Sequence, residues 1–400
     1  MDLKGRKSNH QMKRSIDELR ILFVTRTMHF GGGAERLIFD CYNELKKRNI
    51  TCGIVILEKS DIYGVENGDF FEKKLALEPH IYYPNVDISL SLSGKNFPDV
   101  SEYENVLKTF KPTVIHSHMF LGELLARSIL WPNVKYFSHF HDNMHQLRNW
   151  EWKGKLQKTD MTDFYEKKIL LSAYKKCNNQ FIAISTDSMR YAKKVLPQKL
   201  KNKVVLLPNA VDLSLFSDIP YCAPEQPFRL VNIGSYVDKK NQSFLIDVID
   251  KLTNEGIDVQ LDLLGDGPNR PALQQLIDKK NLQHKVTLHG YVEALPHLKQ
   301  AHLYVHAANY EPFGLVLIEA MAAGVPVVCL DGIGNRGIVK DGHSGFFLRK
   351  PKVDLFANKI TEILSDPITH KAFHLNALED SKKYGIKNYI DRLIDIYQGQ

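Results

Sequence analysis

The chain contains few cysteines and no long apolar segment. Five cysteines occur in 400 residues at scattered positions, and none of them forms a C-x-x-C pair. This pattern favours neither a zinc site nor a disulfide framework, and it predicts a reducing compartment, the cytoplasm. No apolar run approaches the roughly 20 residues that a membrane-spanning helix needs. The basic segment at residues 1–17 lacks the apolar stretch of a signal peptide, so we expect a disordered lead-in.

Several catalytic motifs are also missing. The sequence has no D-x-D acidic pair, no H-E-x-x-H, no P-loop and no G-x-S-x-G. An acidic pair would hold a metal–diphosphate complex, and the other motifs mark zinc peptidases, nucleoside triphosphatases and serine hydrolases. We therefore expect no metal ion and no cofactor.

The net charge of +7 is unevenly distributed. Residues 1–213 hold 33 Lys and Arg against 24 Asp and Glu, a net +9, whereas residues 214–400 hold 20 against 22, a net −2. Without zinc-finger spacing or an RNA-binding aromatic motif, nucleic acid is not the expected partner. A basic face suits anionic lipid headgroups, since each nearby Lys or Arg adds about 1 kcal/mol. The basic surface of the first half therefore either contacts the inner face of the cytoplasmic membrane peripherally or is an ordinary solvated surface.

Length and periodicity predict two domains, because 400 residues exceed one ordinary hydrophobic core. Apolar strand-like runs alternate with helical patterns through the first half, where the last predicted strand is at 203–212, and the alternation restarts at residues 228–235. Such alternation is typical of parallel, doubly wound sheets. We predict a Rossmann-like domain at 18–210, a second at 211–385, and a C-terminal helix within 386–400 that packs back on the first domain.

Two carboxylates stand in an apolar stretch, EPFGLVLIEAMAAGVPVV, which runs from Glu311 to Val328. A buried carboxylate without a partner costs several kcal/mol, so we hypothesise that the partner is a ligand. Pro312 and Gly314 indicate a loop that enters a helix, whose N-terminus suits phosphate or sugar oxygens. Glu319 would lie about two turns into this helix. The alternative is that Glu311 is an ordinary acidic residue at the start of the helix and that Glu319 is a surface residue on a core helix.

Three further features follow predicted strands. The glycine loop Gly31–Gly33 opens a helix, and such a backbone can cradle a diphosphate. Lys240 follows the strand that ends at Gly234 and would neutralise a diphosphate as a point charge. His139 and His141 end another strand, at the edge where open α/β sheets bind ligands. A tight turn, a solvated lysine and core histidines are the alternative explanations.

In this order the motifs resemble the retaining glycosyltransferases of family 4, which have the GT-B architecture of two Rossmann-like domains facing each other across a cleft. The resemblance runs from RILFVTRTMHFGGGAE to IDIYQGQ, and its strongest element is Glu311-x7-Glu319 with the trailing A-x-G-x-P-V-V. LLGDGPNRPALQQLIDKKNLQHKVTLHGYV and VLLPNAVD also look like segments of this family. The resemblance implies transfer of a sugar from a nucleotide-diphosphate sugar, with a UDP-sugar favoured over a GDP-sugar.

The resemblance also implies the roles of second-domain residues. Glu311 would bind hydroxyls of the donor sugar, beside the backbone amides of Phe313, Gly314 and Leu315. Glu319 would hold the ribose of the nucleotide.

Further implied residues come from both domains. Lys240 matches the diphosphate-binding lysine, and Gly32 and Gly33 match the loop near the diphosphate. His141 matches the active-site histidine, with His139 as the alternative at the same strand end. Glu311, His141 and Lys240 are thus the implied catalytic residues.

One position departs from the family pattern. Ser235 stands where the family usually has an arginine directly after the strand glycine, so half of a two-cation clamp on the diphosphate is missing. Arg26 or Lys239 would have to compensate.

The sequence therefore predicts a retaining, metal-independent glycosyltransferase. The expected acceptor is a glycan, in particular a lipid-linked oligosaccharide of a bacterial surface polysaccharide. Two alternatives stay open: a nucleotide-sugar 2-epimerase of GT-B architecture, and a non-catalytic partner subunit, which Ser235 suggests.

Overall fold

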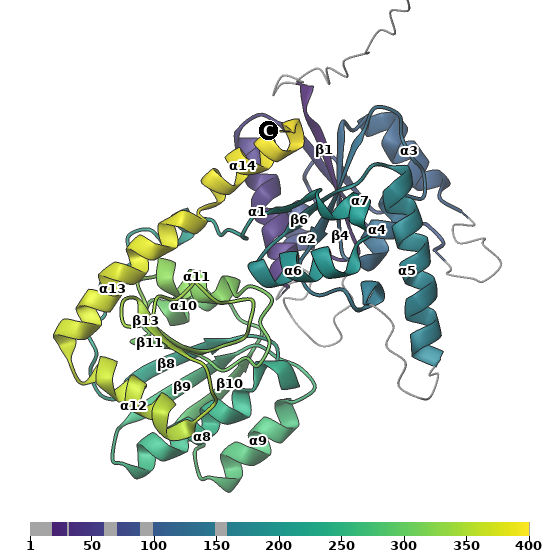
Figure 1. The fold of residues 1–400 in the computed structure, drawn as a ribbon. Helices are drawn as coiled ribbons and strands as arrows, with labels where there is room; N and C mark the ends of the chain where they lie inside the picture. Colours follow the sequence, from purple (N-terminus) through teal and green to yellow (C-terminus); the bar gives the residue numbers. More distant parts are fainter. Residues whose placement is uncertain (1–17, 30–31, 60–69, 89–98, 149–157, 400) are drawn as a thin grey trace, which may run out of the picture.

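Two domains, each a parallel sheet covered by helices, make up the protein (Figure 1). The computed structural model describes residues 18–29, 32–59, 70–88, 99–148 and 158–399. The expected lead-in at 1–17 and Gly31 of the glycine loop lie outside the described residues. The two parallel sheets confirm the predicted α/β class with two Rossmann-like domains.

Within the described residues, the sheet of the first domain has the strand order β3-β2-β1-β4-β5-β6-β7, and neighbouring strands run parallel. The strands are β1 (Arg20–Thr25), β2 (Thr51–Ile56), β3 (Ile81–Tyr82), β4 (Val114–His118), β5 (Lys135–Phe140), β6 (Gln180–Ala183) and β7 (Val204–Leu206).

Helices cover both faces of this sheet. They are α1 (Gly33–Lys47), α2 (Phe70–Leu75), α3 (Ser101–Phe110), α4 (Phe120–Ala126), α5 (Lys158–Lys176), α6 (Thr186–Val195), α7 (Gln198–Lys201) and α14 (Ile386–Gln398). Ile21 and Phe23 of β1 pack in a cluster with α1 and α14, whereas Leu22 and Val24 pack in another with α3 and α4. Because alternate side chains enter two cores, the strand is apolar at every one of these positions.

The sheet of the second domain has the order β10-β9-β8-β11-β12-β13 in the described chain, again with parallel neighbours. Its strands are β8 (Phe228–Ile233), β9 (Val259–Leu264), β10 (Val286–Gly290), β11 (Leu303–His306), β12 (Val327–Leu330) and β13 (Gly345–Leu348). Its helices are α8 (Gln242–Asn254), α9 (Arg270–Lys279), α10 (Ala294–Leu298), α11 (Leu315–Ala322), α12 (Val353–Leu364) and α13 (Pro367–Ser381). Three short 3-10 turns join them: η3 (Leu213–Phe216), η4 (Asp238–Lys240) and η5 (Lys382–Tyr384).

The chain leaves the first domain and later returns to it, and these two crossings are hydrogen-bonded to each other. Val211 N donates to Tyr384 O and Ile386 N donates to Val211 O, each at 2.9 Å. After the return, α14 packs against α1, and its residues Ile390 and Leu393 belong to the first domain's core. Figure 1 shows this yellow helix beside α1, whereas α12 and α13 lie on the second domain.

Two elements differ from the sequence prediction. The strand predicted at 203–212 ends at Leu206, because Pro208 has no N–H to continue a ladder. The two-residue strand β3 was not predicted, since its pattern is too short to be distinguished from a turn.

Candidate active site

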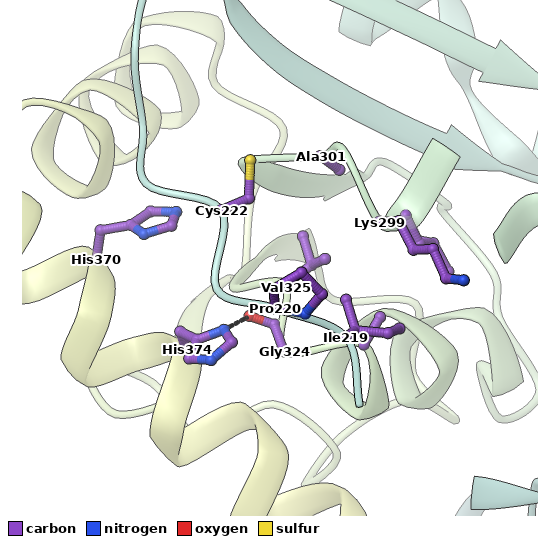
Figure 2. A pocket seen from close by; sticks show the side chains of 11 residues that line it. Ile219, Pro220, Cys222, Lys299, Ala301, Gly324, Val325, His370 and His374 are labelled. Atoms are coloured by element: carbon purple, nitrogen blue, oxygen red, sulfur yellow. Dashed lines mark hydrogen bonds between the residues drawn. The ribbon is translucent and has the colours of Figure 1, made fainter. Parts of the chain in front are cut away.

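A cleft between the two domains has the size of a ligand site. Its volume is about 590 Å³, within the ~300–1,000 Å³ of small-molecule pockets. A second hollow, below the linker at Cys222, holds only about 10 Å³, which is space for no more than one water molecule (Figure 2). There His374 Nδ1 lies 2.6 Å from Gly324 O, and both residues line the hollow. A ligand therefore fits only the cleft of these two.

Most of the residues predicted for the site line this cleft. They are Gly32, Gly33, His141, Ser235, Lys239, Lys240, Glu311, Phe313, Gly314, Leu315 and Glu319. The carboxyl ends of β5 and β8 open into the cleft, which is the usual position of ligand sites in open α/β sheets. Arg26 and His139 are not among the lining residues.

Glu311 is a buried carboxylate with two partners in the chain itself. Lys240 Nζ lies 2.5 Å from Glu311 Oε2, and His306 Nε2 lies 3.1 Å from the same oxygen. Burial would raise the pKa of Glu311, but Lys240 and the hydrogen bond from His306 outweigh burial and lower that pKa to about 2. The hypothesis that the partner is a ligand is therefore wrong for Glu311, because residues 71 and 5 positions away supply it.

The loop after Glu311 directs a helix N-terminus toward the cleft. Gly314 has φ +107°, and a Cβ there would lie 2.9 Å from Leu317 Cδ1, so this turn requires glycine. Helix α11 then begins at Leu315, and the first N–H groups of a helix have no partner within it. These N–H groups and the helix dipole favour an anion or sugar oxygens. Glu319 consequently lies about one turn into α11, not two as predicted.

Glu319 faces the first domain rather than Lys240. Burial raises the pKa of Glu319, and the guanidinium of Arg36 opposes this rise. Arg36 Nε lies 3.1 Å from Asp40 Oδ2, and burial raises the pKa of Asp40 to about 6 against the effect of Arg36. None of the residues in the described ranges forms a hydrogen bond with the half-buried Glu319 carboxylate. Its oxygens can therefore accept bonds from ligand hydroxyls.

Sequence patterns did not single out the cleft face of α1. Arg36, Asp40 and Asn43 line the cleft and recur at i, i+4 and i+7 directly after the glycine loop. This polar stripe could have identified the cleft residues of α1. The prediction used only the apolar stripe of the same helix, which indicates the helix but not the site. Other polar residues that line the cleft without having been predicted are Lys74, Asp142, Asn209, Asp212, Tyr291 and Glu293.

Of the two cations considered as compensation for Ser235, only Lys239 is in the cleft. Lys239 and Ser235 both line it, on the same wall as Lys240. Arg26 instead pairs with Glu58, Nε to Oε2 at 2.8 Å, and its side chain is 52% exposed. Arg26 is therefore wrong as a member of the clamp.

His141 lines the cleft and His139 does not. Strand β5 ends at Phe140, so His141 follows the strand, whereas His139 lies within it and is buried in the sheet. His118 Nδ1 lies 2.7 Å from His141 Nε2, and the His139 ring stacks on the His141 ring with centroids 4.3 Å apart. Burial lowers the pKa of His141 to about 3, so its ring is neutral at pH 7. His116 continues the chain of rings, 3.2 Å from His139 between Nε2 and Nδ1.

A second polar group lies on the opposite face of the same strands, and we name it the Arg127 network. Arg127 Nη1 lies 2.9 Å from Glu123 Oε2, and both side chains are fully buried. Arg127 also donates to Ser117 and Ser138, at 2.9 and 2.8 Å, and to Asn179. Since side chains alternate along a strand, Ser117 and Ser138 hold this network while the neighbouring histidines face the other layer.

Solved structures share this architecture. HepE of Anabaena, solved in complex with UDP and glucose, is 18% identical and superposes with a TM-score of 0.72 over 96% of this chain and 100% of that chain. The paired domains and the cleft between them are thus those of the GT-B glycosyltransferases.

Family models match both domains. The model described as Glycosyltransferase Family 4 matches residues 31–215, and the model described as Glycosyl transferases group 1 matches residues 220–380. The chain belongs to glycosyltransferase family 4, which confirms the resemblance seen in its motifs.

Curated relatives match this chain over part of their length. A poly(glycerol-phosphate) alpha-glucosyltransferase of Bacillus subtilis is 28% identical over 170 residues, which is 42% of this chain and 25% of the relative. An alpha-D-kanosaminyltransferase of Streptomyces kanamyceticus is 29% identical over 182 residues, 44% of this chain and 47% of the relative. The chain thus spans less than half of either relative.

Proposed function

We propose that this glycosyltransferase transfers a sugar from a UDP-sugar to a hydroxyl of a glycan acceptor, with retention and without a metal ion. The observation that carries the proposal is the cleft itself. The Lys240–Glu311 pair lies on one wall, beside the N-terminus of α11, and the glycine loop lies on the other. UDP is favoured over GDP because HepE, which shares the fold, was solved with UDP and glucose.

In this proposal the donor lies along the second-domain wall. Glu319 accepts hydrogen bonds from the ribose hydroxyls, and Lys240 with the N-terminus of α11 faces the diphosphate. Glu311, held ionised by Lys240, accepts bonds from hydroxyls of the sugar. As the glycosidic bond breaks, charge grows on the departing diphosphate, so fixed cations and N–H dipoles stabilise the transition state. Gly32 and Gly33 approach the same region from the first domain.

His141 is proposed to contact the sugar at the first-domain wall. Its neutral ring offers one donor and one acceptor, which suits sugar hydroxyls better than a cation would. The contact with His118 Nδ1 fixes the ring orientation and leaves Nδ1 of His141 without another partner in the described chain. We expect acceptor hydroxyls to lie on this side of the cleft.

Incubation of the purified chain with UDP-sugars, with and without glycan acceptors, tests the function. Transfer that requires the acceptor supports it. A changed sugar nucleotide in the absence of acceptor would instead identify a 2-epimerase. Binding of UDP-sugar without turnover on any acceptor would identify a non-catalytic subunit. The anomeric configuration of the product, read by proton NMR, tests retention.

Removing the carboxylate of Glu319 should weaken nucleotide binding. In Glu319→Ala, loss of a charged hydrogen bond of about 1.5–3 kcal/mol corresponds to a roughly 10- to 150-fold higher Kd for free UDP as well as for UDP-sugar. Calorimetry measures both. The control is Glu362→Ala, a surface carboxylate on α12. Equal UDP affinity in folded Glu319→Ala and in the unmodified chain would remove the ribose role.

Chelation should leave the chemical step intact. Because the sequence contains no D-x-D pair to hold a metal–diphosphate, kcat at saturating donor should be the same in EDTA as in Mg²⁺ or Mn²⁺. Initial rates with excess UDP-sugar provide the measurement. Activity that is lost in EDTA and recovers only with Mg²⁺ or Mn²⁺ would contradict the metal-independent mechanism.

A membrane-associated acceptor is proposed from the first domain's surface. No helix in the described ranges has both the length and the apolar content needed to cross a bilayer. Helix α5 nevertheless exposes Met161 and Phe164, 60% and 61% accessible, on the same face as the exposed Lys168. Apolar side chains beside lysines suit the surface of an anionic membrane.

We therefore expect the chain to bind vesicles that contain anionic lipid at low salt and to dissociate as salt rises, because the Debye length falls to about 8 Å near physiological ionic strength. The double substitution Met161→Ser/Phe164→Ser should reduce binding at every salt concentration. Sedimentation with vesicles measures the bound fraction. Equal binding to neutral and anionic vesicles would exclude an electrostatic contact.

A further inference from the structure

Three metal-ligating side chains converge on the second domain, outside the cleft. Asp262 comes from β9, His289 from the end of β10 and His297 from α10. One ligand atom of each residue lies within 4.8 Å of the others. None of the three residues lines the cleft.

An irregularity in β10 places His289 beside Asp262. In the parallel register Thr287 pairs with Asp262 and Leu288 with Leu263, but Gly290 pairs with the next residue of β9. His289 is the additional residue of this bulge, two positions beyond Thr287 and therefore on the Asp262 face. Bulges commonly redirect a side chain in this way.

The two imidazoles direct nitrogen atoms at one carboxylate. His289 Nε2 lies 2.7 Å from Asp262 Oδ1, and His297 Nδ1 lies 3.4 Å from Asp262 Oδ2. The rings are 4.6 Å apart between centroids and meet edge-on at 68°, so they do not stack face to face. Two hydrogen bonds from the imidazoles to a shared carboxylate explain this arrangement. The same geometry also suits three ligands around one metal ion.

We propose that Asp262, His289 and His297 form a binding site for a divalent transition-metal ion of the zinc type. Two imidazoles and a carboxylate are a ligand set that Zn²⁺ uses in proteins, at about 2.0–2.2 Å from the ion. Two such ligands of a tetrahedral ion lie roughly 3.3 Å apart. The observed separations of 2.7 and 3.4 Å need only small side-chain shifts to match this value. The ion would bind the two ring nitrogens that now face the carboxylate, in their deprotonated form.

Burial and charge favour this site over the histidines beneath the cleft. His116, His118 and His139 also bring ligand atoms within 4.8 Å, but all three are buried and include no carboxylate. A divalent ion there would be desolvated without a compensating negative charge, which is costly. At the proposed site, the side chains of Asp262 and His289 are 35% and 26% exposed, so water can complete the coordination.

The position of the ligands gives the ion a mechanical role. The cleft is lined by residues 291–295, which follow His289 and precede His297. An ion bound to both histidines holds the two ends of this segment together and ties them to β9. The metal site thus restrains the cleft-lining segment 291–295 from the side away from the cleft, without contact with the diphosphate or the sugar.

Metal titration of the untagged, chelator-treated full chain tests the site. Zn²⁺ affinity is measured by competition with a chromophoric chelator, and Co²⁺ provides a visible absorption band that reports the ligand geometry. We expect one high-affinity equivalent in the unmodified chain. His289→Ala and His297→Ala should each weaken Zn²⁺ binding by more than about tenfold. The matched control is His284→Ala, an exposed histidine just before β10, which should bind as the unmodified chain does.

Hydrogen exchange measures whether the bound ion restrains the cleft-lining segment between His289 and His297. Zn²⁺ should slow amide exchange in residues 290–296 of the unmodified chain and of His284→Ala, but not of His289→Ala. No Zn²⁺ binding by the folded chain would overturn the proposal. So would Zn²⁺ binding that persists in both His289→Ala and His297→Ala and is lost in His118→Ala, because the ion would then occupy the buried histidines. These readouts do not involve sugar transfer, so they stand apart from the proposed reaction.

Discussion

Lys240→Met should lower kcat by about 10²- to 10³-fold and change KM much less. Loss of one preorganised group that stabilises developing charge typically has an effect of this size on turnover. The diphosphate gains charge only as the sugar departs, so a cation beside it stabilises the transition state more than the bound donor. No arginine at position 235 shares this role. Steady-state kinetics with a UDP-sugar and its acceptor provide the measurement.

The matched control is Lys239→Met, since both lysines belong to η4 and both line the cleft. Lys239 is not paired with Glu311 and should have the smaller effect. If the two substitutions lower kcat equally, the two lysines share the diphosphate between them. Turnover that is intact in folded Lys240→Met would contradict the proposed role.

The same substitution should change how stability depends on pH. Because the pKa of Glu311 is lowered to about 2 from its ordinary value of 4.5, its pairing stabilises the fold fully above about pH 4.5, and this contribution is lost as pH falls toward 2. In Lys240→Met the cation is gone while burial still raises the pKa of Glu311. The loss of stability as pH falls from about 4.5 toward 2 should therefore largely disappear. Thermal melts at several pH values, together with Lys240→Met/Glu311→Gln, separate the folding effect from the catalytic one.

Ser235→Arg tests the missing half of the clamp. If a second cation is simply absent, Ser235→Arg should partly restore kcat in the Lys240→Met background. If Lys239 already fills this position, an added arginine should be neutral or harmful through like-charge repulsion. Each outcome assigns the second cation.

Arg127→Met should destabilise the first domain by about 3–5 kcal/mol, the cost of leaving one member of a buried ion pair without its partner. Glu123 would be left fully buried without its counter-charge, where burial already raises its pKa against the effect of Arg127. Ser117 and Ser138 would lose their shared donor as well. Urea unfolding followed by circular dichroism measures the change.

Arg190→Met is the comparison on the surface. Arg190 and Asp187 form an ion pair on α6, but the arginine side chain is 71% exposed, so its loss should cost about 1 kcal/mol or less. The double substitution Glu123→Leu/Arg127→Met should destabilise less than Arg127→Met alone, since no charge is left buried. If Arg127→Met and Arg190→Met are equally stable, the buried pair does not have the assigned importance.

Local patterns predicted the fold because strands such as β1 send alternate side chains into two cores. Ile21–Val24 is apolar for that reason, and the glycines and helix that follow this strand are adjacent to it in sequence. The pair of glutamates eight residues apart was equally visible. These features depend on neighbours along the chain, which periodicity and turn chemistry report directly.

Contacts between distant residues could not be predicted in the same way. Lys240 and Glu311 are 71 positions apart, and Arg36 and Glu319 belong to different domains. Alternation along β5 places His139 and His141 on the same face, so only the point where the strand ends decides which one reaches the cleft. Pairing, strand length and domain orientation are set by packing across the whole molecule.

The return of α14 to the first domain affects the order in which the protein can fold during synthesis. Residues 18–210 leave the ribosome first, but their core lacks Ile390 and Leu393, and His116 lacks the hydroxyl of Tyr397 at 2.6 Å, until α14 has been made. The second domain has all of its strands available earlier. Of these two domains, the one translated earlier is therefore completed later, and its unfinished apolar face is the one that chaperones would encounter.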